Sequence, residues 1–146
     1  MDPEKAKLPV VAAYVSTYLP ADMRHVFRQV VALSTFRAAV LTRKRRNEET
    51  YPLHKKQITL LPRPRTRELR RWWFGKVKKV PVPLTDAEVR DALYALQKHN
   101  AQVLHVYFGN IAAQLLPLLR VLRHPVVVSF HGADAGVDTE NSNYRA

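Results

Sequence analysis

The chain of 146 residues contains no cysteine and only four glycines. The absence of cysteine excludes a disulfide framework, a thiolate zinc site, an iron–sulfur cluster and a cysteine nucleophile. With so few glycines, the sequence has neither a G-x-x-x-x-G-K phosphate loop nor a G-x-G-x-x-G dinucleotide turn. It also has no H-x-x-x-H pair and no clustered carboxylates, so we expect no metal site.

Long apolar runs and acidic residues are scarce as well. No apolar stretch approaches the roughly 18 residues of a membrane-spanning helix. We therefore expect a cytoplasmic protein, with peripheral contact at the inner face of the membrane as an alternative. Twelve acidic residues face 24 lysines and arginines, which gives a net charge of +12, but a hydrophobic fraction of 47% still predicts a folded domain.

The positive charge is concentrated in one segment. From Arg43 to Lys79 there are 14 basic and three acidic residues, so the rest of the chain is nearly neutral. Basic residues beside aromatic ones predict a surface for phosphates, either of nucleic acid or of anionic lipid. An equally weighted alternative is a solvated connection whose tryptophans pack onto the body. The residues assigned to the anionic-binding surface are Arg63, Arg65, Arg67, Arg70, Arg71, Trp72 and Trp73.

Apolar strand-like runs alternate with amphipathic helical segments along the chain. The pattern predicts strands over residues 9–16, 36–41, 57–61, 103–108 and 126–130, and helices over 20–34, 85–100 and 111–122. Thr85 and Glu88 have the spacing of a capping box, Asn110 is the expected N-cap of the last helix, and Pro117 is expected to kink it.

This alternation predicts an α/β, Rossmann-like parallel sheet with helices on both faces. We expect one domain over residues 8–134 with a basic insertion at 43–80, followed by a polar tail at 135–146.

The residues that leave each strand are the candidates for a site, because ligands of such sheets bind outside the carboxyl ends of the strands. His131 is the sharpest candidate, since an apolar strand presents it and Gly132 follows at once. A histidine there can donate to a phosphate or a sugar hydroxyl, although a core histidine is the alternative. The further candidates are Thr17, Tyr18, Arg24, His105, Phe108, Gly109 and Asp134.

The segments LHVYFG and HPVVVSFHGAD, with the leucine-rich helix between them, resemble the N-terminal, acceptor domain of family 4 glycosyltransferases of the GT-B fold. The match covers about Ala101 to Asp134, and residues 8–42 match in the order of elements. The resemblance implies one half of a GT-B transferase that moves sugar from a nucleotide-sugar donor to a glycan or lipid-linked acceptor, with no metal or other cofactor. Polysaccharide biosynthesis is the implied setting.

By position, the resemblance implies that His131 is the catalytic histidine of the cleft. It implies that Gly132 is a close-approach turn and that Phe108 and Gly109 shape the acceptor side. Arg24 stands where related subgroups hold polar residues that contact the acceptor. Tyr107 replaces the second histidine of the family pattern, which is a departure.

The second, donor-binding domain of the family is absent from these 146 residues. The chain is therefore expected to be a truncated member, one part of a split enzyme whose partner chain supplies the donor domain, or a pseudoenzyme scaffold. A hypothesis of a different class is a nonenzymatic basic module that binds nucleic acid or a membrane, with nucleic acid the less favoured partner. The sequence leaves these alternatives open.

Overall fold

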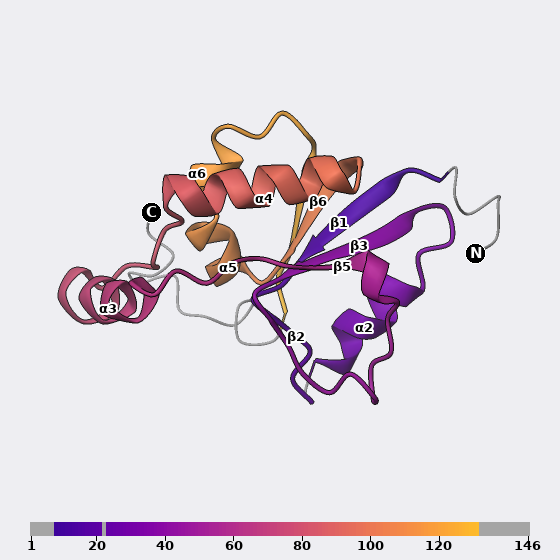
Figure 1. Cartoon of the computed structure of the whole chain (residues 1–146), viewed down its shortest axis with the longest axis horizontal. Helices are drawn as coiled ribbons and strands as arrows, with labels where there is room; N and C mark the ends of the chain where they lie inside the picture. Colours follow the sequence, from indigo (N-terminus) through magenta and orange to yellow (C-terminus); the bar gives the residue numbers. More distant parts are fainter. Residues whose placement is uncertain (1–7, 22, 132–146) are drawn as a thin grey trace.

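The computed structural model describes residues 8–21 and 23–131 of the chain. Its centre is a five-stranded parallel sheet in the order β5-β3-β1-β6-β7 (Figure 1). The strands are β1 (Val10–Tyr14), β3 (Arg37–Thr42), β5 (Ile58–Leu60), β6 (Ala101–Tyr107) and β7 (Val126–Ser129). All five expected strands are thus present, with shorter bounds at β1, β5 and β7.

The central strand β1 explains why these segments read as apolar runs. All five of its residues are buried, because β3 and β6 pair with its two edges and helices cover both faces. Ala12 and Tyr14 pack in the core on one face, and Ala13 packs in the core on the other. A parallel strand covered on both sides needs apolar residues at every position.

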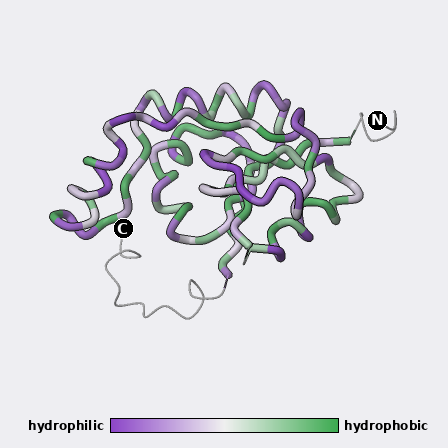
Figure 2. Tube along the Cα trace, turned by 60° about the horizontal axis from the view of Figure 1, so that its bottom comes forward, coloured by the Kyte–Doolittle hydropathy of each residue, from purple (hydrophilic) through white to green (hydrophobic). Residues whose placement is uncertain are grey.

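Helices lie on both sides of the sheet, which confirms the predicted α/β, Rossmann-like fold. Helix α2 (Arg24–Val31) covers one face through Val26 and Val30. Helices α4 (Asp86–Lys98), α5 (Gly109–Gln114) and α6 (Leu116–Leu119) cover the other (Figure 1). Hydrophobic and hydrophilic stretches alternate along these helices, as expected when one face packs on the sheet (Figure 2).

The helix ends follow most of the sequence signals. Thr85 and Glu88 form the predicted capping box at the start of α4. The expected single helix over 111–122 is two pieces, α5 and α6, with Pro117 in the first turn of the second. Asn110 as an N-cap is wrong, because α5 begins at Gly109 and Phe108 occupies the N-cap position.

The segment rich in basic residues is more structured than the sequence indicates. Strand β4 (Lys44–Arg45) pairs with β2 (Thr17–Tyr18) in a separate two-stranded sheet, and the short helix η1 (Lys55–Gln57) leads into β5. Helix α3 (Arg67–Trp72) then continues as the π-helical turn η2 (Trp73–Lys78). We call residues 67–78 the basic arm. It projects from one end of the molecule (Figure 1).

Among residues 8–21 and 23–131, no helix combines the length and hydrophobicity needed to cross a bilayer.

Candidate functional site

The candidate site lies at the carboxyl ends of the strands, which share one edge of the sheet because all five strands are parallel. The chain runs outward from β1 through β3 to β5, then crosses to β6 on the other side of β1. Such a reversal of strand order opens a crevice at the carboxyl edge where α/β proteins bind ligands. The residues that follow β1, β3, β6 and β7 are therefore the candidates for the site.

On the β6 and β7 side, aromatic rings gather around His131. The rings of His131 and His25 have centroids 4.7 Å apart, and that of Phe108 is 5.5 Å from His131. Tyr107 stacks near-parallel to His131 at 5.9 Å and to His105 at 4.2 Å. We call these five residues the ring cluster. Tyr107 is 2% exposed and forms the floor of the cluster, so the rings that can face a ligand are those of His25, Phe108 and His131.

Hydrogen bonding and burial tune the ring cluster. His105 Nε2 lies 2.6 Å from Ser129 Oγ across the β6–β7 pair. Burial, and to a lesser extent the charge of His131, lower the pKa of His105 below its usual range. Burial also raises the pKa of Tyr107 to about 12. The side chains of His105 and Tyr107 are therefore uncharged near neutral pH.

The backbone at the end of β6 is strained. Phe108 has φ 78°, a conformation that residues with a side chain rarely adopt. Gly109 follows with its Cα close to Phe130, so that a Cβ at this position would collide with the phenyl ring. Strained residues of this kind gather at ligand sites in proteins.

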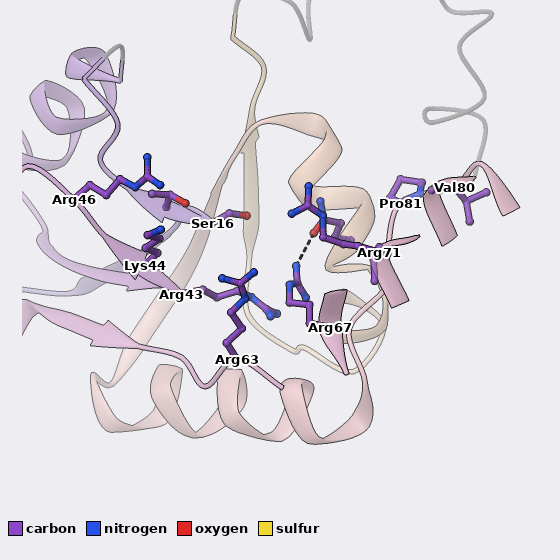
Figure 3. Close-up of a pocket in the computed structure, with 13 residues that line it drawn as sticks. Ser16, Arg43, Lys44, Arg46, Arg63, Arg67, Arg71, Val80 and Pro81 are labelled. Carbon is purple, nitrogen blue, oxygen red and sulfur yellow. Dashed lines mark hydrogen bonds between the residues drawn. The ribbon is translucent and has the colours of Figure 1, made fainter. Parts of the chain in front are cut away.

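On the β1 and β3 side, the edge carries a pocket lined by positive charge (Figure 3). Its volume is about 630 Å³. We call it the cationic pocket. Its lining consists of Ser16, Thr17, Arg43, Lys44, Arg46, Arg63, Arg67, Arg71, Gly75, Val80, Pro81, Val82 and Gln114.

A single buried carboxylate organises the wall of the cationic pocket. Glu88 is 4% exposed, and its Oε1 accepts from Arg43 at 2.5 Å and from Arg67 at 3.0 Å. Its Oε2 accepts from Arg70 at 3.1 Å and from the Thr85 backbone at 2.9 Å. Burial alone would raise the pKa of Glu88, but the Thr85 and arginine donors lower it to about 2. Glu88 therefore ties α4 to the end of β3 and to the basic arm.

The sequence-predicted site residues divide between the two sides of this edge. His131, His105 and Phe108 meet in the ring cluster, and Gly109 supports it. Thr17 instead lines the cationic pocket. Gly132 and Asp134 lie outside the described residues.

Tyr18 and Arg24 have different settings. Tyr18 is 1% exposed and packs in the core beside Tyr107, so it does not face a ligand. Its burial raises its pKa to about 12, although the charge of Arg45 acts in the opposite direction. Arg24 is exposed at the start of α2, one residue before His25 of the ring cluster.

The residues assigned to an anionic-binding surface fall into two groups, one exposed to solvent and one in contact with Glu88. Trp72 and Trp73 are 58% and 47% exposed, so the alternative that they pack onto the body is wrong. Arg65 and Arg71 are exposed as well, and Arg63 pairs with Glu68 at the surface. Arg67 and Arg70 instead turn inward onto Glu88, and the guanidinium of Arg70 also lies 6.0 Å from the ring centre of Phe74.

Sequence reasoning did not find several residues of the site. Arg43, Lys44 and Arg46 counted only as charge, although their position directly after an expected strand was the available signal. His25 is exposed on α2, and its ring contacts that of His131. Nothing in the sequence indicates that Gln114 borders the pocket and accepts from Arg67 at 3.3 Å.

The part of the chain that the structure describes holds no group of three or more histidine, cysteine, aspartate or glutamate side chains placed to bind a metal ion. The arrangement is instead suited to binding anions on one side and flat or hydroxylated groups on the other. No family model, curated protein or solved structure matches the chain.

Proposed function

We propose that this chain is the acceptor-side domain of a sugar-transferring enzyme with a GT-B architecture. The observation that carries the proposal is the ring cluster, in which His131 meets Tyr107, Phe108 and His25 at the carboxyl edge where the strand order reverses. Aromatic faces pack against sugar rings, and an imidazole exchanges hydrogen bonds with hydroxyl groups. The resemblance of residues 101–134 to family 4 glycosyltransferases supports the same function.

In this function the ring cluster holds the acceptor while a donor-side domain holds a nucleotide sugar. The sugar leaves the diphosphate of the donor, and its anomeric carbon bonds to the acceptor hydroxyl oxygen. In this proposal, His131 holds that hydroxyl or receives its proton. The donor-side domain is the implied partner, and a glycan or lipid-linked compound is the implied acceptor.

The test is sugar transfer from labelled UDP-glucose or GDP-mannose to a lipid and glycan extract, with and without a separately expressed donor-side domain of a GT-B glycosyltransferase. We expect transfer only when both are present. His131→Ala should lower the rate by about 100-fold or more, whereas His124→Ala, at an exposed position away from the ring cluster, should not. Transfer by the chain alone, or transfer that His131→Ala leaves intact, would contradict the proposal.

We also propose that the basic arm contacts an anionic membrane. Its outward face carries apolar residues at helical spacing, Leu69, Trp72, Trp73 and Val77, each about half exposed or more. A helix in a globular protein normally turns such a face inward. Tryptophan beside lysine and arginine is typical of helices that lie in the interface of an anionic bilayer.

Vesicle sedimentation tests this contact. Vesicles containing phosphatidylserine should bind the chain, and vesicles of phosphatidylcholine alone should not. The double variant Trp72→Ala/Trp73→Ala should lose most of the binding, while Tyr94→Ala, at an even more exposed aromatic residue on α4, should retain it. Salt-sensitive binding to duplex DNA or RNA together with no binding to either vesicle would instead favour the nonenzymatic nucleic-acid module.

A further inference from the structure

The cationic pocket has far more positive than negative charge. Six cationic side chains line it, and none of its lining residues within 8–21 and 23–131 is acidic. Two carboxylates pair with this group: Glu88, in contact with Arg43 and Arg67, and Glu68, in contact with Arg63 and Arg71. Glu88 also binds Arg70. Among the described residues, five of these seven cations thus contact two carboxylates, and neutralising the surplus charge requires an anionic ligand or solution counterions.

Part of this charge is held away from water. The guanidinium groups of Arg43 and Arg67 both contact Oε1 of Glu88, so they are held close together, and Arg67 is 9% exposed. Burial, followed by the charge of Arg43, lowers the pKa of Arg67 below its usual range. Like charges in a partly desolvated place repel each other strongly. An anion of more than one charge would offset this repulsion.

The donors in the pocket match phosphoryl oxygens. Five of the six cations are arginines, whose planar guanidinium groups bind pairs of phosphate oxygens in a fixed geometry. The hydroxyl groups of Ser16 and Thr17 add neutral donors. Arg43, Arg63 and Arg67 lie near one another at the centre of the pocket, with Arg46 on one side and Arg71 on the other (Figure 3).

The volume of about 630 Å³ lies within the range of small-molecule sites. The cations also come from three separate stretches of the chain, at residues 43–46, 63 and 67–71, and converge on one hollow. Convergence on one half-open hollow differs from the extended groove that tracks a nucleic-acid backbone.

We propose that the cationic pocket binds the diphosphate group of an organic diphosphate. Arg43 and Arg67 contact it at the inner wall, and Arg46, Arg63 and Arg71 contact it at the rim. The organic part is either a nucleoside or a lipid chain, and both present the same diphosphate to these arginines. The pocket is separate from the ring cluster, so this inference does not depend on sugar transfer.

Isothermal titration of the chain at low ionic strength tests the site with inorganic pyrophosphate, orthophosphate and sulfate as probes. We expect pyrophosphate to bind at least ten times more tightly than either single anion. Equal affinity for all three probes, or no measurable binding of pyrophosphate, would overturn the proposal. Uridine diphosphate and geranyl diphosphate then distinguish the two sources, because tighter binding of one than of pyrophosphate identifies the favoured organic group. Equal binding of both means that the diphosphate alone is recognised, which also supports the proposal.

A matched pair of variants localises the binding. Arg46→Gln/Arg63→Gln removes two exposed rim cations, and we expect it to weaken pyrophosphate binding by at least ten-fold. Arg120→Gln/Arg123→Gln removes the same charge at exposed positions outside the pocket and should change the affinity less than three-fold. Circular dichroism checks that both variants fold. If the two double variants weaken binding equally, the ligand responds to net charge and not to this pocket.

Discussion

The two sides of the carboxyl edge of the sheet differ in their chemistry, one being strongly charged and the other aromatic. The cationic pocket beside β1 and β3 concentrates permanent charge, which one buried carboxylate holds in place. The ring cluster beside β6 and β7 has stacked rings and a histidine that burial keeps neutral near pH 7. Tyr18 lies buried between them, since both Arg45 and Tyr107 influence its pKa.

This difference shows that the sheet provides position and the residues after each strand provide chemistry. The cationic pocket depends on charge balance, so changes of charge should affect it most. The ring cluster depends on shape and neutral contacts, so changes of volume and of protonation should affect it. Three sets of variants test this division, in order of the expected effect.

The largest effect is expected on the cationic side, from Glu88→Gln. The variant keeps the volume of the side chain but leaves three guanidinium groups without their shared anion. Breaking a buried ion pair on one side costs about 3–5 kcal/mol. Urea unfolding at pH 7 should show this loss, whereas Glu49→Gln, an exposed position, should change the free energy of unfolding by less than about 0.5 kcal/mol.

The same variant should remove an acid-dependent part of the stability. The pKa of Glu88 is lowered from 4.5 to about 2, so its contribution is complete above pH 4.5 and is lost as the pH falls toward 2. This contribution is about 3 kcal/mol, from the shift of the pKa. If wild type and Glu88→Gln lose stability equally between pH 4.5 and 2, the arginines do not depend on this carboxylate.

The sheet and its long helix could be predicted from local patterns. The valine- and alanine-rich run of β1 indicates burial on both faces, and the spacing of Thr85 and Glu88 indicates the start of α4. The basic arm could not be predicted in this way. Its apolar residues Leu69, Trp72 and Trp73 face solvent, whereas pattern reasoning assumes that such residues face a core.

The two sides of the site also differ in how far the sequence predicts them. His131, Phe108 and Gly109 were identifiable because they follow strands directly and ligands bind there. The cationic pocket requires three separated stretches of chain to converge, which no local spacing shows. Glu88 had a visible role as a capping residue, but its burial against three arginines appears only in three dimensions.

A pair of glycine variants compares the packing of the two sides. Gly109→Ala places a Cβ against the ring of Phe130, and we expect a loss of about 1–2 kcal/mol. Gly75→Ala, in the π-helical turn that borders the cationic pocket, meets no atom within 4 Å. It should stabilise the chain by about 0.5–1 kcal/mol because alanine favours helix. Thermal or urea unfolding measures both, and equal effects would show that the ring cluster is as open as the pocket.

The smallest effect is expected in the protonation of the ring cluster. Burial, and secondarily the charge of His131, holds the pKa of His105 below 6.5. In His131→Gln the repulsion disappears but burial remains, so the pKa of His105 should rise part of the way and still lie below 6.5. NMR titration of the imidazole Cε1 protons measures this change, and His124→Gln serves as the exposed control. Because its folded-state pKa is depressed, His105 contributes stability above pH 6.5 that is lost as the pH falls through the depressed pKa. If the pKa of His105 is the same in wild type and in His131→Gln, the two histidines act independently. The ring cluster then lacks the electrostatic coupling that distinguishes it from a packed aromatic core.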